Sequence, residues 1–361
     1  MEVLVSAWVG STNLGDELVF RGLCRRLAAP GAGVTAVSVA PAATRAAHGV
    51  AAIDHRDVAG LVRATRRADL VVLGGGGLVQ DSTSALNLPY HLSRLVPARL
   101  SAKPLAVVGI GAGPLRGRLG TGLARVALAG AHVCTARDAA SAQLLRDLGV
   151  SPVELTADLA FALPVPAVAV EDSLVVCLRP WTGRRGRLPV ALRRPGDDVA
   201  PWFVATMAGA LDAAASATGL AVRLVAFQAD RDGPLHDRVA ERLTVPVSTV
   251  RPDVDDVVDE VARGRVVVAM RYHALVSAVL GGRPAVSLGY DAKVDSLAAD
   301  VGSGVVARGC DRSAVENVAE AIVELAINDH ASAEAGVVDA RARLRRREHG
   351  NGTALELLLS P

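Results

Sequence analysis

Aromatic side chains are scarce in this sequence, and so is a net charge of either sign. Phe, Trp and Tyr together make up 3% of the 361 residues, which leaves few platforms for stacking nucleic-acid bases. The formal net charge is only +2, with acids and bases interspersed, so the basic field that marks many nucleic-acid-binding proteins is missing. We therefore expect no nucleic-acid partner.

Paired cysteines and long apolar runs are missing too. Cys24, Cys134, Cys177 and Cys310 are far apart and show neither disulfide nor metal-ligand spacing, which indicates buried thiols in a reducing compartment. The first residues, MEVLVSAWVG, lack the basic region of a signal peptide. No apolar run reaches the roughly 18 residues of a membrane span. We expect a cytoplasmic protein without an integral membrane segment; peripheral contact with the inner membrane face stays open.

Apolar residues make up 51% of the chain. They are arranged in a repeating pattern typical of alternating strands and helices. Short continuous Val/Leu/Ile/Ala runs alternate with amphipathic stretches, which is typical of parallel sheets covered on both faces. Strands are expected near 2–8, 34–39, 69–73, 104–110, 132–135, 153–155, 173–178, 221–227, 246–248, 265–269 and 284–288. Helices are expected near 16–28, 57–67, 88–101, 117–129, 138–147, 200–217, 234–243, 254–263, 272–280, 293–299, 312–328 and 333–347.

This rhythm predicts an α/β fold with two Rossmann-like domains that face each other across a cleft. The expected parts are an N-terminal domain over 1–165, a C-terminal domain over 172–330 and a helical tail over 331–361. The segment 182–198, rich in Arg, Gly and Pro, fits neither period. A solvated loop is the favoured interpretation there, and a basic lid over an anionic substrate is the alternative.

Charged side chains at the ends of two consecutive strands of the C-terminal half indicate an anion site. Arg271 and His273 follow the strand VVVAM, and Lys293 follows the next strand, AVSL. In parallel sheets, ligands bind beyond the carboxyl ends of the strands, where helix N-termini favour phosphate or carboxylate. If the two strands are neighbours, all three side chains lie at one edge. The alternative is an ordinary ion pair for Arg271 and a core position for His273.

Two segments of the N-terminal half carry polar groups beside glycines. In GSTNLGDE (10–17), Asn13 can bond backbone or ligand, and Asp16 is either functional or a helix N-cap. In GGGGLVQDSTS (74–84), the backbone can approach a ligand or another chain closely, and Gln80 and Asp81 are acceptor contacts. The latter segment lacks the lysine and hydroxyl ending of a P-loop.

Further arginines follow strands, and other chemistries fit poorly. Arg137 follows the strand that ends in CTA, and Arg179 follows VVCL; each alone is a weak signal, because strand-end arginines often form surface ion pairs. The segment GIGAGPLRG (109–117) lacks the spacing of a dinucleotide-binding fingerprint. Neither a metal-ligand spacing nor a G-x-S-x-G motif is present.

Taken in order, seven segments resemble the polysaccharide pyruvyl transferase family, and most closely its bacterial cell-wall branch, the CsaB type. The segments are GSTNLGDE, VVLGGGGLVQD, GIGAGPL, ARDAAS..LL..LGV, TADLAF, CLRPW and AMRYHALVSAVLGGRPAVSLGYDAKV. The resemblance runs from about residue 3 to residue 300. The ordered set of segments is more specific than any one segment. Tyr272 departs from it, since an aliphatic residue is expected there.

The resemblance implies a fold like that of GT-B glycosyltransferases. It implies transfer of pyruvate from phosphoenolpyruvate to a pair of sugar hydroxyls as a ketal, on a cell-wall or extracellular polysaccharide precursor. Phosphoenolpyruvate would be a co-substrate, with no metal or other cofactor. The resemblance also marks Asp16, Arg137, His273 and Lys293 as functional positions.

Phosphoenolpyruvate carries a phosphate and a carboxylate, so its site needs several fixed cations. The expected donor-binding residues are Arg137, Arg179, Arg271 and Lys293. The expected acceptor-binding residues are Asn13, Gly75, Gly76, Gln80 and Asp81. His273 is expected to transfer a proton or to act as a neutral donor to phosphate, and Asp16 to accept the hydroxyl proton.

Two alternatives from other classes stay open. The first is a GT-B glycosyltransferase or a sugar-nucleotide epimerase, which shares the architecture. The second is a non-catalytic sugar-binding member that has kept the fold. The acceptor, either a sugar or a lipid-linked saccharide, is not specified by the sequence. For the arginine run at 341–347, a solvated helix face is the favoured interpretation, and contact with anionic lipid beside a lipid-linked acceptor is the alternative.

Overall fold

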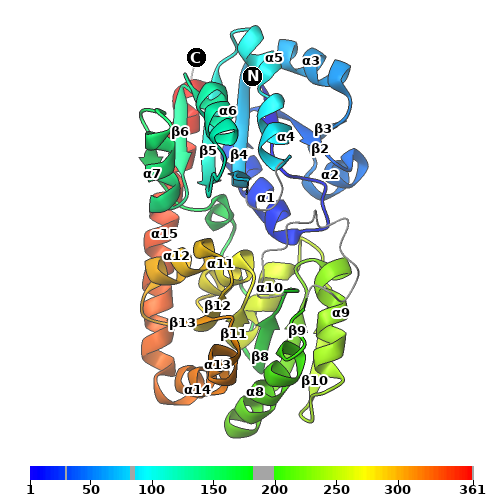
Figure 1. Ribbon diagram of the computed structural model, residues 1–361, viewed down its shortest axis with the longest axis vertical. Helices are drawn as coiled ribbons and strands as arrows, with labels where there is room; N and C mark the ends of the chain where they lie inside the picture. The colour runs from blue at the N-terminus through cyan, green and yellow to red at the C-terminus, as the bar shows by residue number, and fades with distance from the viewer. Residues whose placement is uncertain (29–30, 82–85, 182–198, 360–361) are drawn as a thin grey trace. The chain divides into compact units, whose positions relative to one another are not determined.

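The protein divides into two compact units (Figure 1). The computed structural model describes residues 1–28, 31–81, 86–181 and 199–359. Unit 1 comprises Met1–Ser11, Asp16–Leu163 and Leu344–Pro361, and unit 2 comprises Thr12–Gly15 and Pro164–Arg343. The predicted loop or lid at 182–198 lies outside the described residues.

Unit 1 contains a seven-stranded sheet of order β3-β2-β1-β4-β5-β6-β7, with parallel neighbours throughout. Its strands are β1 (Glu2–Ser6), β2 (Gly33–Ser38), β3 (Ala51–Asp54), β4 (Leu70–Val79), β5 (Leu105–Ala112), β6 (Val133–Ala136) and β7 (Glu154–Leu155). Its helices are α1 (Leu14–Ala28), α2 (Pro41–His48), α3 (Val58–Arg67), α4 (Asn87–Ser93), α5 (Val96–Leu100), α6 (Arg118–Leu128), α7 (Ala139–Asp147) and the 3₁₀ helix η1 (Leu159–Ala162). The first two residues of α1 belong to unit 2.

Unit 2 contains a six-stranded parallel sheet of order β10-β9-β8-β11-β12-β13. Its strands are β8 (Glu171–Cys177), β9 (Ala221–Val225), β10 (Val247–Val250), β11 (Gly264–Ala269), β12 (Ala285–Gly289) and β13 (Val305–Gly309). Its helices are α8 (Phe203–Thr218), α9 (Ala229–Ala240), α10 (Val257–Ala262), α11 (Tyr272–Gly281), α12 (Ala292–Val301), α13 (Arg312–Glu316), α14 (Val318–Val323) and the π-helical turn η3 (Glu324–Asn328). The last helix, α15 (His330–Leu359), runs from unit 2 into unit 1.

Continuous apolar strands arise because each sheet is buried on both faces. Side chains alternate along a strand, so neighbouring residues enter opposite layers. Val3 and Val5 of β1 belong to one core cluster of unit 1, and Leu4 between them belongs to the other. The same burial makes residues 174–177 of β8 and residues 266–269 of β11 in unit 2 continuous apolar runs.

The structure corrects several boundaries expected from the sequence. The edge strands β3 and β13 were not predicted, because each is short and largely half-buried or exposed, so its apolar signal is weak. Helix α2 was missed as well. Strand β4 continues through the glycine run, and the expected helix at 88–101 is divided into α4 and α5. Helix α9 begins before Pro234, which lies inside it.

The C-terminal segment predicted as a tail takes part in the core of unit 1. The fully buried Asn351 of α15 accepts hydrogen bonds from the hydroxyls of Thr135 (2.6 Å) and Thr156 (2.8 Å). Leu355 and Leu359 join the core cluster that contains Val5 of β1. The domain limits of 1–165, 172–330 and 331–361 stay a prediction from the sequence, and the structure groups the last residues with unit 1.

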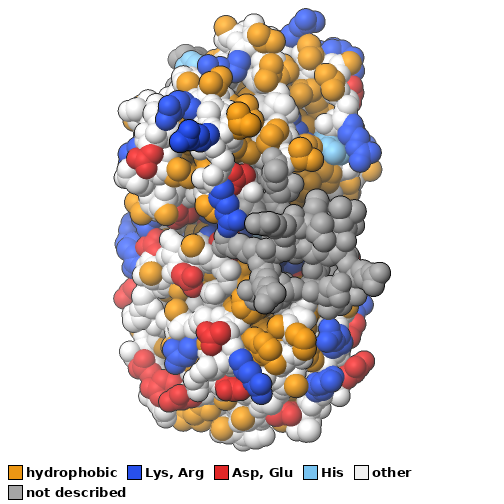
Figure 2. Space-filling view, viewed as in Figure 1, with side chains coloured by type: hydrophobic (Ala, Val, Ile, Leu, Met, Phe, Trp, Pro, Cys, Tyr) orange, Lys and Arg blue, Asp and Glu red, His pale blue; other side chains and the backbone are white. Residues whose placement is uncertain are grey.

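Charge is mixed over the surface of the described residues. Figure 2 shows basic and acidic side chains interspersed on the face that it draws, as the net charge of +2 suggests. Among the described residues, no helix is long and apolar enough to cross a membrane. The cytoplasmic location and the peripheral membrane contact stay predictions.

An aromatic cluster follows the first and fourth strands of unit 1. Tyr90 and His91 of α4 lie edge-on to Trp8, with ring centroids 5.7 and 5.9 Å from the indole. The Arg94 guanidinium lies 3.8 Å from the centroid of the Tyr90 ring. Burial, reinforced by the charge of Arg94, lowers the pKa of His91 to about 3. His91 is therefore neutral at physiological pH.

This lowered pKa predicts how His91 couples stability to pH. Below the ordinary histidine pKa the unfolded chain binds a proton at His91 that the folded chain does not, so stability falls as pH falls toward about 3. We expect His91→Gln to reduce the slope of unfolding free energy against pH by up to about 1.4 kcal/mol per pH unit. Urea unfolding between about pH 6 and pH 4 measures this slope. The control is His132→Gln, at an exposed position; equal slopes for the two variants would contradict the prediction.

Candidate active site

Three neighbouring strands of unit 2 are followed by polar side chains at their carboxyl ends. Strand β11 lies between β8 and β12 and pairs with both in parallel, so these ends meet at one edge of the sheet. Arg179 comes two residues after β8, Arg271 two residues after β11, and Tyr290 directly after β12. The prediction that the strands before Arg271 and before Lys293 are neighbours is confirmed.

Arg271 forms a buried ion pair with Asp232 in the first turn of α9. Its Nε donates to Asp232 Oδ2 at 3.0 Å, and its Nη2 donates to Asp232 Oδ1. Nη2 also donates to Gln228 Oε1 at 3.3 Å. The Asp232 side chain is fully buried. The ion pair, one of the two interpretations left open by the sequence, is therefore present, and it fixes the guanidinium beside the strand ends.

Arg179, Tyr290 and Lys293 form a second group at this edge. Arg179 Nη1 donates to Tyr290 Oη at 2.7 Å, and the Arg179 guanidinium carbon lies 4.4 Å from the centroid of the Tyr290 ring. Lys293 lies half-buried in the first turn of α12, which Asp291 caps by accepting from the Lys293 backbone N–H at 3.4 Å. Arg179 Nε is buried and has no hydrogen-bond partner among the described residues.

These cations act on the Tyr290 phenol. Burial alone would raise the pKa of Tyr290, but the positive charges of Lys293, Arg179 and Arg271 outweigh it and lower the pKa below its ordinary value. The site thus presents three cations around one ionisable hydroxyl.

The loop Thr12–Gly15 belongs to unit 2 and is held by the residues after β9. The Leu14 N–H donates to the Phe227 carbonyl at 2.9 Å, and Gln228 Nε2 donates to Thr12 Oγ1 at 3.1 Å. Gln228 also accepts from Arg271, so one side chain links the loop to the buried ion pair.

The same loop lies against His273 at Gly15. Asn13 Oδ1 accepts from the Gly15 N–H at 3.3 Å. His273, in the first turn of α11, lies so close to Gly15 that a methyl group on Gly15 would overlap the imidazole. Of the predicted site residues, unit 2 therefore brings together Asn13, Arg179, Arg271, His273 and Lys293.

Arg137, predicted with the donor-binding arginines, lies in unit 1 and has other partners. Its guanidinium is buried and pairs with Asp158 at 3.2 Å and with Asp138 at 3.3 Å. A Cβ on Gly111 would lie 2.7 Å from Arg137 Nη2, so that glycine makes room for the arginine. Asp138 also caps α7, accepting from the Ser141 N–H at 2.8 Å.

Asp16 and the glycine run meet in unit 1. Asp16 lies inside the first turn of α1, which begins at Leu14, so it is not the N-cap. A Cβ on Gly76 would lie 3.8 Å from Asp16 Oδ1, which leaves the Gly76 backbone open beside a carboxylate. At Gly75, a Cβ would overlap Val19 of α1. Packing of α1 against β4 therefore requires a glycine at position 75, whether or not Gly75 also contacts a ligand.

Asp81 holds a loop rather than pointing freely from the strand end. Its carboxylate accepts from the Arg116 N–H at 2.8 Å and from the Gly117 N–H at 3.2 Å, which orders the approach to α6. The Gln80 carbonyl accepts from Asn87 Nδ2 at 3.0 Å, at the start of α4. These contacts give Asp81 a structural role beside its predicted acceptor contact.

Sequence reasoning missed Tyr290, Asp232 and Gln228 as site residues. Tyr290 directly follows a strand, and the rule that selected Lys293 would also have selected it. Asp232 and Gln228 follow β9, but their role depends on the pairing with Arg271, which no local pattern shows. Among the described residues, no group of three or more His, Cys, Asp or Glu could hold a metal ion.

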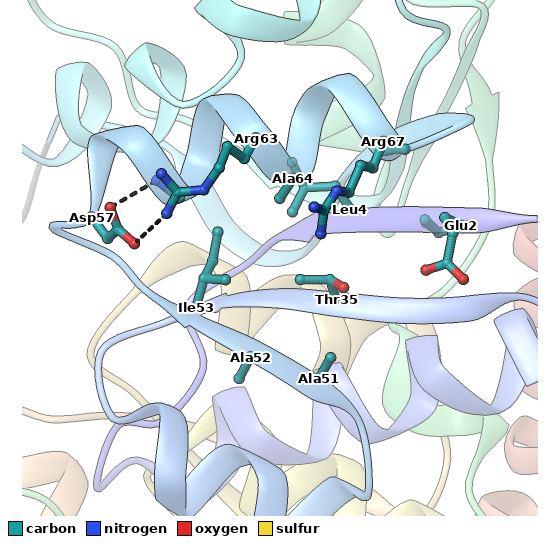
Figure 3. Close-up of a pocket in the computed structure, with 13 residues that line it drawn as sticks. Glu2, Leu4, Thr35, Ala51, Ala52, Ile53, Asp57, Arg63, Ala64 and Arg67 are labelled. Carbon is teal, nitrogen blue, oxygen red and sulfur yellow. Dashed lines mark hydrogen bonds and ion pairs between the residues drawn. The ribbon is translucent and has the colours of Figure 1, made fainter.

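A cavity of about 410 Å³ lies elsewhere in unit 1, between α3 and strands β1 to β3. Its lining includes the small side chains of Thr35, Ala51 and Ala52, and an ion pair of 3.7 Å joins Asp57 to Arg63 at one end (Figure 3). Glu2 and Ala51 begin their strands, so the cavity extends toward the amino ends and lies off the edge where parallel sheets bind ligands.

The contact between the loop and His273 is tested by Gly15→Ala. The added methyl must displace either the imidazole or the loop, and we expect destabilisation of about 1–3 kcal/mol. The measurements are the melting temperature and the imidazole nitrogen shifts of His273 by NMR.

Gly209→Ala in α8 is the matched control, because nothing lies within 4 Å of a Cβ at that position. We expect it to keep or raise the melting temperature, since alanine favours helix. A Gly15→Ala variant with unchanged melting and unchanged His273 signals would contradict the contact.

Comparison with known proteins agrees with this architecture. The solved structures that resemble the chain include UDP-GlcNAc 2-epimerase from Neisseria meningitidis bound to UDP-GlcNAc (11% identity, TM-score 0.60, 99% of this chain and 98% of that one). A second is the S. aureus MnaA-UDP co-structure (12% identity, TM-score 0.63, 98% of this chain and 94% of that one). A third is a glycosyltransferase from Rickettsia africae ESF-5 (8% identity, TM-score 0.61, 99% of this chain and 98% of that one). These likenesses confirm the predicted fold, two parallel-sheet α/β domains of the GT-B type.

The search of curated proteins found no match. The model of one family, described as polysaccharide pyruvyl transferase, matches residues 13–292. The matched range begins at Asn13 and ends one residue before Lys293, so it includes Arg179, Arg271, His273 and Tyr290. The chain belongs to the polysaccharide pyruvyl transferase family.

Proposed function

We propose that this protein transfers pyruvate from phosphoenolpyruvate to two hydroxyls of a saccharide, forming a ketal. The observation that carries the proposal is the convergence of Arg179, Arg271 and Lys293 at three adjacent places on the edge of the unit 2 sheet. Family membership supports pyruvyl transfer to a polysaccharide. The donor identity and a cell-wall precursor of the CsaB type are parts of this proposal.

A small trianion suits the charges at this edge. Phosphoenolpyruvate carries two acidic groups on a three-carbon frame, and fixed guanidinium and ammonium groups can bind both. The buried Arg179 Nε lacks a partner among the described residues, and a buried unsatisfied donor costs about 1–3 kcal/mol. An anion that accepts from this N–H would remove that cost.

The remaining predicted roles follow from this donor site. In this scheme His273 donates a hydrogen bond to the phosphate or transfers a proton, and Asp16 accepts a hydroxyl proton of the acceptor. Gly76 offers open backbone beside Asp16, which supports an acceptor contact there. Arg137 is held by two carboxylates and is the weakest of the proposed donor contacts.

The second candidate is glycosyl transfer or sugar-nucleotide epimerisation. The names of two structural neighbours contain UDP or UDP-GlcNAc, which favours testing this class. Their identity to this chain is at most 12%, so the likeness supports the fold alone. A non-catalytic member would bind a ligand and release no phosphate.

Thermal denaturation with phosphoenolpyruvate tests the donor site through Lys293. A ligand at about 100 times its Kd raises the unfolding free energy by about 2.7 kcal/mol. We expect this stabilisation in the parent protein and a Kd raised about 10- to 100-fold in Lys293→Met, because a hydrogen bond to a charged group contributes about 1.5–3 kcal/mol. Arg271→Ala is a poorer test, since it would leave the buried Asp232 carboxylate without its ion-pair partner and so destabilise the fold.

The chain offers a matched control in its one other lysine. Lys103 precedes β5 at the amino end of the unit 1 sheet, and Lys103→Met should keep the full stabilisation. Equal binding by both variants would remove Lys293 from the donor site. Stabilisation by UDP-sugars without any by phosphoenolpyruvate would favour the second candidate.

A further inference from the structure

We infer that Tyr290 is the acid that protonates the donor, delivering its phenolic proton to the methylene carbon of phosphoenolpyruvate. The inference rests on the proposed function and adds a catalytic residue that neither sequence patterns nor the family match assign. It starts from the position of the hydroxyl. Tyr290 is the first residue after β12, between the strand end and the capping residue Asp291, and is surrounded by the cations proposed to bind the donor.

The hydrogen bonding leaves the phenolic proton directed away from Arg179. Guanidinium is a donor only, so in the 2.7 Å contact Arg179 Nη1 donates and Tyr290 Oη accepts. The phenol O–H must therefore donate to another group. The guanidinium carbon also lies 4.4 Å from the ring centroid, which limits the freedom of the ring. A fixed ring with an uncommitted O–H direction is the geometry that a positioned acid needs.

The surrounding charge stabilises the phenolate that proton transfer leaves behind. Lys293, Arg179 and Arg271 together overcome the effect of burial and lower the pKa of Tyr290. Before transfer, the bound trianion offsets these cations and keeps the phenol protonated. As the proton leaves, the phenolate meets charges that are already in place, so no reorganisation is needed. The same cations thus serve both substrate and acid.

The reaction balances with the donor, the acceptor diol and two proton-transfer groups, Tyr290 and Asp16. The electron pair of the donor C=C bond takes the phenolic proton and forms the methyl C–H bond, which leaves a cation-like central carbon. The first acceptor hydroxyl bonds to that carbon and gives its proton to Asp16, the base of the proposed scheme, and this proton restores the phenol before the next turnover. The second hydroxyl displaces phosphate at the same carbon, and its proton leaves with the phosphate as hydrogen phosphate. No oxidant or reductant is required.

This assignment changes what is required of His273. With Tyr290 as the acid for carbon, the imidazole is available for the phosphate, the other of its two proposed roles. His273 opens α11 and Tyr290 follows β12, so the two groups come from adjacent strand–helix connections of one sheet. The division of labour separates protonation of carbon from departure of phosphate.

The experiment compares Tyr290→Phe with the parent protein in full-length form. We expect phosphate release to fall about 10²- to 10⁴-fold, while stabilisation by phosphoenolpyruvate changes little, because Phe keeps the ring. The parent should lose activity as pH rises through the lowered phenol pKa, since the acid must be protonated. The residual activity of Tyr290→Phe should lack this basic limb. Site-specific 3-fluorotyrosine, a stronger acid, should move the limb to lower pH.

A readout independent of turnover uses the scarcity of tyrosine. The chain has 3 tyrosines, so ring-labelled protein gives three NMR signals, which single Tyr→Phe variants assign. Phosphoenolpyruvate should raise the pKa of the Tyr290 signal, because an added anion offsets the nearby cations. Tyr90→Phe, in unit 1, is the matched control; its hydroxyl bonds His55 at 2.7 Å, and it should keep turnover within a few-fold.

The outcomes separate this inference from the proposed function. Absence of both phosphoenolpyruvate binding and turnover in the parent protein overturns the proposed function and this inference with it. An active parent with an equally active Tyr290→Phe overturns only the role of Tyr290. A slow Tyr290→Phe that keeps the basic limb makes Tyr290 a positioning residue for Arg179 and overturns it as the acid. If saturating phosphoenolpyruvate leaves the pKa of the Tyr290 signal unchanged, Tyr290 is overturned as the acid. This measurement needs no acceptor.

Discussion

The buried ion pair between Arg271 and Asp232 is the constraint on which the edge of the unit 2 sheet depends. Asp232 is fully buried, and a buried carboxylate without a partner would be strongly unfavourable. The pair joins the end of β11 to the start of α9. Through Gln228 it also reaches Thr12, so one guanidinium fixes a strand end, a helix start and a distant loop of the chain.

This constraint explains how Arg271 can be structural and still serve a ligand. Arginine has five N–H donors in a fixed plane, and Asp232 and Gln228 use only part of that capacity. The pair fixes the direction of the guanidinium, while its charge still acts on Tyr290. Lys293 and Arg179 have no comparable buried carboxylate pair among the contacts described above, and their positions depend on the first turn of α12 and on the Tyr290 ring.

The sequence predicted the fold class and the sheet edge well, because both depend on local patterns. Apolar runs predict parallel strands, and the residues after each run then lie at a common edge, as found for Arg179, Arg271 and Lys293. Short edge strands such as β3 were not predicted, since few of their side chains are buried. The ion-pair partner of Arg271 was not predicted for a different reason. Asp232 is 39 residues from Arg271, and only the folded sheet order brings β9 close to β11 through β8.

The glycine run shows why a motif can be found from the sequence while what approaches each glycine stays open. Four consecutive glycines predict close backbone approach, and the sequence left open whether a ligand or another chain is the approaching group. In the structure the group that approaches Gly74 and Gly75 is helix α1, through Leu23 and Val19. Only Gly76 opens toward a polar group, Asp16. Because a missing Cβ accommodates a helix as readily as a substrate, sequence alone cannot separate these uses, and the contribution of each glycine depends on what lies beside it after folding.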